Sequence, residues 1–165
     1  MRIIVVGAGE VGTYVADRLS RQEHDIALIE LDPERFRQID AELDVLVING
    51  SGTDPAALQR AGIDDTDLLV AATNKDEINL FSALLARQAG VNKTIVRVES
   101  RKLRSKEVSA LFDKFDDHLV IDPDQEVADS VLRLMEYPGA MDLSRMADEE
   151  VVIIGARLPA HAPMV

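Results

Sequence analysis

The fold is decided by a stretch near the start of the sequence, Ile3-Ile4-Val5-Val6-Gly7-Ala8-Gly9-Glu10-Val11-Gly12. Its apolar first half predicts a strand that is covered on both faces, as in a parallel sheet. Its second half is G-x-G-x-x-G, followed by an amphipathic helix expected over residues 10–22, which is typical of a dinucleotide-binding turn. Gly7 would permit the tight turn, Gly9 the approach of a pyrophosphate, and Gly12 the close packing of helix against strand.

We expect this glycine loop to bind phosphates, because a helix N-terminus offers free N–H donors and the positive end of the helix dipole. A glycine-rich turn without a ligand is the alternative interpretation. The residues expected to contact the ligand here are Gly7, Ala8, Gly9, Glu10, Val11 and Gly12.

Glu30 ends the second expected strand, eighteen residues after Gly12. A carboxylate at this position accepts hydrogen bonds from the ribose hydroxyls of adenosine. It would also repel a 2′-phosphate, which disfavours NADP. The next arginine, Arg35, lies on the following helix, and Asp32 is interpreted as the N-cap of that helix.

Further polar residues follow the later strands, where open α/β sheets bind ligands. Thr73-Asn74 follow the fourth expected strand, which would neighbour the first strand at the switch point of the sheet. Ser51 and Gly52 follow the third strand, and a ligand contact and ordinary loop chemistry are equally compatible with them. Arg97 interrupts an apolar strand and therefore needs an anionic partner, either a bound phosphate or a carboxylate, which would be that of Glu99 or one in the cleft.

Short apolar runs alternate with amphipathic stretches, so we expect an α/β, Rossmann-like, doubly wound parallel six-stranded sheet with a C-terminal crossover helix. Residues 1–122 would form the nucleotide-binding domain, residues 123–148 the crossover helix and a connecting segment, and residues 149–165 the start of a truncated further domain. That division rests on a final strand, expected at 151–154, which has no evident partner strand. The other strands are expected at 1–6, 25–29, 45–48, 68–72, 94–98 and 119–121, and helices at 10–22, after Asp32-Pro33, after Asp54-Pro55, and at 78–89, 103–112 and 124–136.

Composition excludes several classes of function. The 18 basic and 30 acidic residues give a net charge of −12, which argues against binding to nucleic acid or to an anionic membrane surface. There is no cysteine, and the longest apolar runs are too short to span a bilayer, so we expect a cytoplasmic protein. One basic cluster, residues 101–106, is compatible with an acidic partner or with a solvated helix face.

No catalytic residues are expected. A dehydrogenase normally places a general acid or base beside the nicotinamide. The three histidines, His24, His118 and His161, fall at a helix end, at a strand start and in the C-terminal tail, and they show no metal-ligand spacing. Asp76 and Glu77 are explained as helix-start acids that complement the helix dipole. A small NAD-dependent oxidoreductase and a redox-sensing binding module remain the alternatives.

Taken together, these residues resemble the N-terminal nucleotide-binding domain (RCK, or KTN, domain) of the TrkA family of bacterial potassium-uptake regulatory proteins. The resemblance rests on the glycine loop, Glu30, Gly50-Ser51-Gly52-Thr53, Ala72-Thr73-Asn74 with Asp76-Glu77 and Asn79, and Arg97. Its most specific piece is Arg133-Leu134-Met135-Glu136-Tyr137-Pro138-Gly139-Ala140. Many relatives carry aspartate where Ser51 stands, and such proteins usually carry two tandem units.

The resemblance implies a regulatory subunit rather than an enzyme. Such a subunit binds NAD or NADH, and in relatives ATP or ADP, and lies on the inner face of the membrane below a TrkH-like potassium transporter. The cofactor positions carried over by resemblance are Gly7 to Val11, Glu30, Thr73, Asn74 and Arg97. Homo-oligomers, dimers or tetrameric rings, would form through the helix after Asp124 and the apolar residues up to Met146.

Overall fold

The computed structural model describes residues 1–112, 117–136, 140–146 and 151–156. The chain divides into two compact units, Met1–Asp122 and Pro123–Val165, and each is described by itself. Across the described residues, no helix combines the length and the apolar character that crossing a membrane requires.

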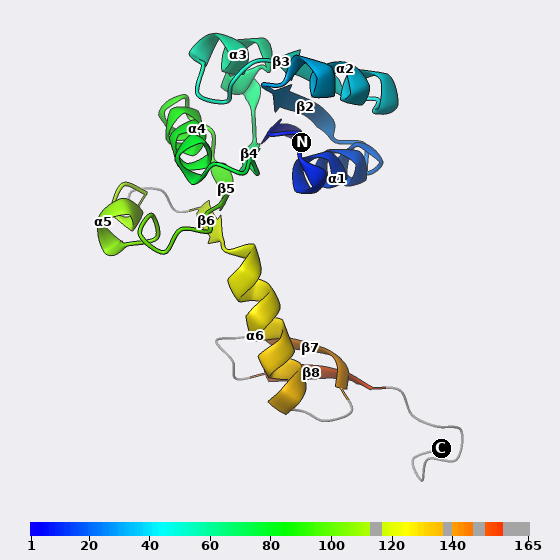
Figure 1. The fold of residues 1–165 in the computed structure, drawn as a ribbon, viewed down its shortest axis with the longest axis vertical. Coiled ribbons are helices and arrows are strands. Elements are labelled where there is room, and N and C mark those ends of the chain that lie inside the picture. Colours follow the sequence, from blue (N-terminus) through cyan, green and yellow to red (C-terminus); the bar gives the residue numbers. More distant parts are fainter. Residues whose placement is uncertain (113–116, 137–139, 147–150, 157–165) are drawn as a thin grey trace. The chain divides into compact units, whose positions relative to one another are not determined.

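The first unit is built on a six-stranded, all-parallel sheet with the order β3-β2-β1-β4-β5-β6 (Figure 1). The chain starts in the middle of the sheet, runs outward to β3, and then returns to place β4 on the other side of β1. This confirms the predicted Rossmann-like sheet and its switch point between β1 and β4. The strands are β1 (Arg2–Val6), β2 (Asp25–Glu30), β3 (Leu46–Asn49), β4 (Leu68–Ala71), β5 (Lys93–Arg97) and β6 (Asp117–Ile121).

Helices connect the strands, and the two that follow Asp32 and Asp54 begin where the sequence indicates. Asp32 caps α2 by accepting the backbone N–H groups of Glu34 and Arg35 at 2.8 and 2.9 Å, as predicted. Asp54 caps α3 in the same way through Ala56 at 2.9 Å. The helices of the first unit are α1 (Glu10–Ser20), α2 (Pro33–Glu42), α3 (Pro55–Arg60), the 3-10 turn η1 (Ile63–Asp65), α4 (Asp76–Gln88) and α5 (Lys106–Ser109).

Two apolar layers pack on the two faces of the sheet. Alternate residues of β1 separate them: Ile3 and Val5 face α1 and α2, whereas Ile4 and Val6 face α3 and α4. All four side chains are buried. The sheet is therefore covered on both faces at its centre, which explains why β1 is a continuous apolar run.

The helix predicted over residues 103–112 is wrong in extent, because the structure has only the short helix α5 there. Residues 101–104 form turns, and Ser105 takes an extended conformation at the N-cap, so the helix begins three residues later than expected. Phe112 is nevertheless buried, and Leu103 packs against the same apolar layer. The apolar residues that suggested a longer helix lie instead in turns, where Phe112 is buried and Leu103 is partly buried.

The second unit contains α6 (Pro123–Glu136), in agreement with the expected helix, and an antiparallel pair of strands, β7 (Ala140–Met146) and β8 (Val151–Ala156). The expectation that the strand near residue 151 has no partner is therefore wrong. Apolar alternation in β7 is interrupted at Arg145, so period-two patterning predicted this strand only weakly. The domain division at residue 149 stays a prediction, since 147–150 and 157–165, including His161, lie outside the described residues.

Candidate functional site

A cleft of about 780 Å³ opens at the carboxyl ends of the central strands of the first unit. The residues that follow β1, β2, β3 and β4 all contribute to it, as expected for ligand binding at a switch point. Apolar residues form part of its wall, and charged side chains converge on it. It is lined by Val6, Gly7, Gly9, Glu10, Val11, Ile29, Glu30, Leu31, Asp32, Pro33, Arg35, Gly50, Ser51, Gly52, Ala72, Thr73, Asn74, Lys75, Ile78 and Arg97.

The three glycines of the glycine loop (residues 7–12) differ in their surroundings. Gly7 has φ = +96°, a conformation that favours glycine, and Gly12 packs so closely that an added Cβ would lie 1.8 Å from the carbonyl oxygen of Gly7. Gly9 is different, because no atom lies within 4 Å of an added Cβ. Gly9 therefore leaves open space at the N-terminus of α1, where residues 9–11 line the cleft and the first N–H groups of a helix have no partner within it.

Glu30 joins the glycine loop to the end of β2. One carboxylate oxygen accepts the backbone N–H of Ala8 and the other accepts that of Asp32, both at 2.8 Å. These two bonds fix the carboxylate in the wall of the cleft. A carboxylate has about four acceptor positions, so its remaining lone pairs can accept ligand hydroxyls.

Asn79 holds together the ends of β4 and β5, although it does not line the cleft. Its side chain is fully buried, and its Nδ2 donates to the carbonyl oxygens of Thr73 and Arg97, both at 2.9 Å. Its Oδ1 accepts the backbone N–H of Thr73 at 2.9 Å. The positions of two predicted site residues therefore depend on one buried amide.

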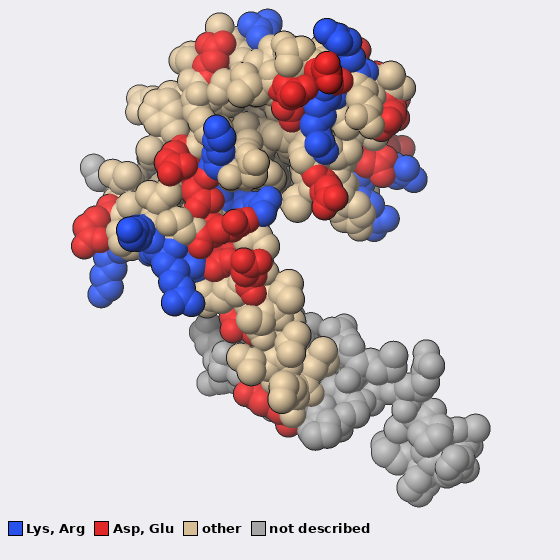
Figure 2. All heavy atoms as spheres, in the orientation of Figure 1, with Lys and Arg blue, Asp and Glu red and all other residues tan. Residues whose placement is uncertain are grey.

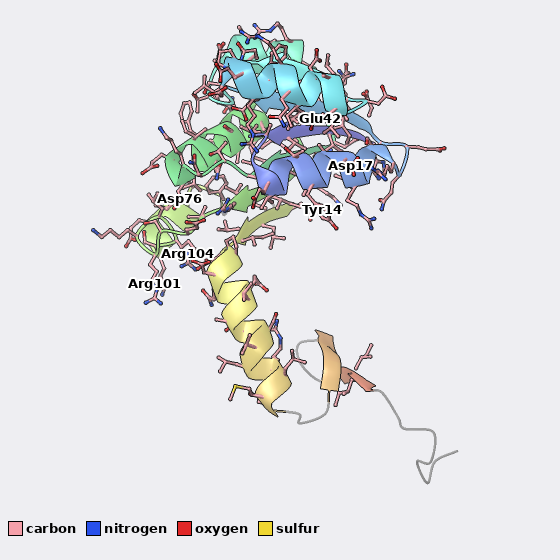
Figure 3. The ribbon with its side chains drawn as sticks, turned by 45° about the vertical axis from the view of Figure 1, so that its right-hand side comes forward. Tyr14, Asp17, Glu42, Asp76, Arg101 and Arg104 are labelled. Carbon is pink, nitrogen blue, oxygen red and sulfur yellow. The ribbon has the colours of Figure 1, made fainter. Side chains whose placement is uncertain are left out.

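Arg97 lines the cleft and also forms an ion pair with Glu99. Its Nε is buried without a hydrogen-bond partner among the described residues. Both partners considered for Arg97, the nearby carboxylate and a ligand in the cleft, are therefore within reach. Asp76, at the start of α4, accepts the backbone N–H groups of Glu99 and Ser100 at 3.2 and 2.7 Å and so ties down this segment (Figure 3).

The charges around the cleft are mixed. The carboxyl pKa of Asp32 is lowered by the backbone N–H bonds from Arg35 and then from Glu34, so this group stays ionised at the rim. Glu10 begins α1 and Glu30 is bound to two amides. The cations in the lining are Arg35, Lys75 and Arg97, of which Arg97 has a carboxylate partner.

Most of the predicted site residues meet in this cleft. Those that line it are Gly7, Gly9, Glu10, Val11, Glu30, Thr73, Asn74 and Arg97. The other two do not: Ala8 is fully buried and supplies its amide to Glu30, and Gly12 serves the packing of α1 on the loop. Ser51 and Gly52 also line the cleft, while the Ser51 hydroxyl is 2.7 Å from that of Thr53.

Sequence reasoning missed two cations of the cleft, Arg35 and Lys75. Lys75 directly follows Thr73-Asn74 and is the N-cap of α4, so its place in the sequence could have indicated it. Arg35 lies one turn into α2, and only the path of that helix brings it to the glycine loop. Val11, which was expected among the ligand contacts, is exposed and lines the cleft.

Other groups of chemical interest lie outside the cleft. His24 and His118 do not line it, and the described residues contain no group of side chains suited to holding a metal ion. The basic cluster at 101–106 also lies away from it, around α5, where Figure 2 shows basic side chains gathered. Within that cluster Arg104 pairs with Asp122 at 2.7 Å, while Arg101, Lys102 and Lys106 are exposed.

Comparison with known proteins agrees with this geometry. The TrkA-N domain family matches residues 3–114. The Trk system potassium uptake protein TrkA of Halomonas elongata is 32% identical over 166 residues, which cover 100% of this chain and 36% of that protein. The chain thus spans about a third of the length of this curated relative.

Solved structures show the same fold at low sequence identity. The TrkA-N domain of the inner membrane protein ybaL from Escherichia coli superposes with a TM-score of 0.68 at 18% identity, covering 81% of this chain and 96% of that one. The GsuK channel bound to NAD gives a TM-score of 0.65 at 14% identity, covering 89% of this chain and 25% of the channel. The chain has the parallel sheet and the glycine loop, and the family match covers residues 3–114. It therefore belongs to the TrkA-N domain family.

Proposed function

We propose that the cleft binds an adenine nucleotide, NAD or NADH foremost and ATP or ADP as alternatives, and that binding regulates a potassium uptake system. The observation that carries the proposal is the open space at Gly9, which leaves the N-terminus of α1 accessible from a cleft that also contains Glu30. Phosphates bind at such helix N-termini because free N–H groups and the helix dipole favour anions.

The lining supports a defined orientation of the nucleotide. The phosphates would lie against the amides of residues 9–11, and the adenosine ribose would donate to Glu30. Thr73 and Asn74, at the end of β4, would contact the part of the ligand that crosses the switch point. Arg97 would then hold a phosphate or another anionic group in addition to Glu99.

The role in potassium uptake rests on the relatives. Proteins that match the whole of this chain are Trk system potassium uptake proteins, and one similar structure is a channel bound to NAD. We infer a regulatory domain that acts on a TrkH-like membrane transporter from the cytoplasmic side. Nucleotide binding would bias two arrangements of a homo-oligomer, because a ligand shifts such an equilibrium by its difference in affinity for the two states.

Titration calorimetry with NADH, NAD, ATP and ADP tests nucleotide binding. Saturable heat at one site per chain with at least one of the four is the expected result. The oligomer is tested separately, by size-exclusion chromatography with light scattering with and without the bound nucleotide. A strict monomer at high concentration in both conditions would contradict the assembly.

The alternative of a small NAD-dependent oxidoreductase is disfavoured by the composition of the cleft. None of the histidines in the described part of the chain lines it, and the carboxylates of Glu30 and Asp32 are both engaged with backbone amides. Incubation with NADH and a panel of carbonyl compounds checks this. We expect no substrate-dependent oxidation of NADH. Turnover with any of the carbonyl compounds would show that the domain is an enzyme and contradict the proposed regulatory function.

A further inference from the structure

Arg35 is anchored on the glycine loop by a contact that its sequence position does not suggest. Its Nε donates to the carbonyl oxygen of Ala8, and the same oxygen accepts the hydroxyl of Thr13 at 3.0 Å. Glu30 meanwhile accepts the N–H of Ala8 at 2.8 Å. The peptide groups on both sides of Ala8 are therefore hydrogen-bonded, and the Nε of Arg35 is held at the glycine loop.

The two terminal nitrogens of Arg35 remain available. Among the described residues no hydrogen bond or ion pair to them is formed, although the side chain lines the cleft. The carbonyl that Nε contacts carries no net charge, so it does not neutralise the guanidinium. Asp32, whose pKa the charge of Arg35 helps to lower, has its carboxylate bound to the N–H groups of Glu34 and Arg35 and forms no ion pair with the Arg35 side chain among the described residues.

We propose that Arg35 binds the 5′-phosphates of the nucleotide, so that the cleft selects adenine compounds with two or more phosphates over adenosine. This proposal rests on the proposed function. A guanidinium group presents parallel N–H donors that match two phosphate oxygens, and such charge-assisted bonds are stronger than neutral ones. Anchoring Nε on Ala8 aims the remaining donors with little loss of side-chain entropy on binding.

A 2′-phosphate is the other anion that an arginine near the ribose can bind. The carboxylate of Glu30 argues against a 2′-phosphate here. Glu30 accepts the N–H of Ala8 and Arg35 donates to the carbonyl oxygen of the same residue, so a negative charge lies at the same part of the glycine loop as Arg35. A 2′-phosphate on a ribose held by Glu30 would meet this carboxylate first and be repelled. In the proposed orientation the 5′-phosphates would instead lie along the glycine loop, where the amides of residues 9–11 favour an anion.

The test compares ADP with adenosine in calorimetric titrations of the wild-type chain and of Arg35→Gln. Glutamine keeps an N–H donor but removes the charge and the fork, so we expect the ADP affinity to fall about tenfold and the adenosine affinity to change less than twofold. Arg37→Gln is the matched control. Arg37 lies on the same helix but does not line the cleft, and this variant should bind both compounds as the wild type does.

Arg35→Lys separates charge from geometry, and we expect it to bind ADP more tightly than Arg35→Gln and less tightly than wild type. Equal losses of affinity for ADP and adenosine in Arg35→Gln, at an unchanged melting temperature, would show that Arg35 only positions the glycine loop. That result would overturn the proposal. Unchanged ADP affinity, or a loss confined to NADPH, would overturn it too. If the wild type binds none of NADH, NAD, ATP and ADP, the proposed function itself fails.

Discussion

Asn79 accepts the hydroxyl of Thr73 at 2.6 Å and the backbone N–H of the same residue at 2.9 Å. One oxygen of a buried amide on α4 thus sets the backbone and the side-chain rotamer of a residue in the wall of the cleft. Since Asn79 also binds the carbonyl of Arg97 at 2.9 Å, it acts as a clamp between the ends of β4 and β5.

Removal of this clamp should destabilise the domain. Asn79→Ala would leave the N–H of Thr73 and the carbonyls of Thr73 and Arg97 without partners in a buried place, at a cost of about 3 kcal/mol in the free energy of unfolding. Urea denaturation followed by circular dichroism measures this. Asn74→Ala is the control, because Asn74 is an exposed asparagine of the same cleft and should unfold as the wild type does. Equal stability of the two variants would rule out the clamp.

Two glycines of the loop should respond in opposite ways to the same substitution. In Gly12→Ala the new methyl group would lie 1.8 Å from the carbonyl oxygen of Gly7, so the helix must shift, and we expect a loss of about 3 kcal/mol or more. In Gly9→Ala, where no atom lies within 4 Å and φ is −65°, stability should change by less than about 1 kcal/mol. Thermal unfolding of both variants decides the matter, and similar melting temperatures would contradict the packing seen here.

Glu30 should govern the choice between NADH and NADPH. Its carboxylate is fixed by the amides of Ala8 and Asp32 and would repel a 2′-phosphate, so the wild type should bind NADH at least tenfold more tightly than NADPH. Glu30→Gln keeps the size of the side chain and removes its charge, and this variant should lose most of the preference. Competition titrations measure both ratios. Equal affinities in the wild-type chain would remove the role assigned to Glu30.

His118 should make the stability of the domain depend on pH. Burial foremost, and then the positive charge of Arg87, lowers its pKa to about 4, and its ring stacks on Phe112 with centroids 3.8 Å apart. The unfolded chain binds a proton near pH 6.5 and the folded one only near pH 4, so stability is full above pH 6.5 and declines as the pH falls toward 4.

The expected loss across this interval is on the order of 1–2 kcal/mol, since the ring is partly solvated. Denaturation of the wild type and of His118→Asn at pH 7.5, 6 and 4.5 isolates it. Carboxylates contribute equally to both proteins, so the difference between them belongs to His118. Parallel pH dependences in the two proteins would show that the histidine is not held neutral.

The strands of the sheet could be read from the sequence because central parallel strands are buried on both faces and therefore appear as apolar runs. The starts of two helices could also be predicted, at Asp32-Pro33 and Asp54-Pro55, because an aspartate N-cap followed by proline at the first helical position is a typical helix start. The glycine loop and Glu30 followed from spacing alone. All of these are local signals, complete within a few residues.

What could not be read depends on contacts between distant segments. Arg35 reaches Ala8 across 27 positions of the sequence, and nothing near Arg35 indicates where α2 will carry it. β7 and β8 pair only with each other among the described strands, so the partner of β8 could not be predicted from the residues of β8 alone. The segment from Leu103 to Phe112 looked like one helix, but both residues lie in turns around the short helix α5, where Phe112 is buried and Leu103 packs against the same apolar layer.

If adenine nucleotides bind with their phosphates at the N-terminus of α1, a methyl group at Gly9 must weaken that binding. NADH and ADP are titrated into the wild type and into Gly9→Ala, whose added methyl group meets no protein atom within 4 Å. We expect saturable heat in the wild type and at least tenfold weaker binding in the variant at an unchanged melting temperature. Undiminished binding in the variant, or no heat from either compound in the wild type, would contradict this mode of binding.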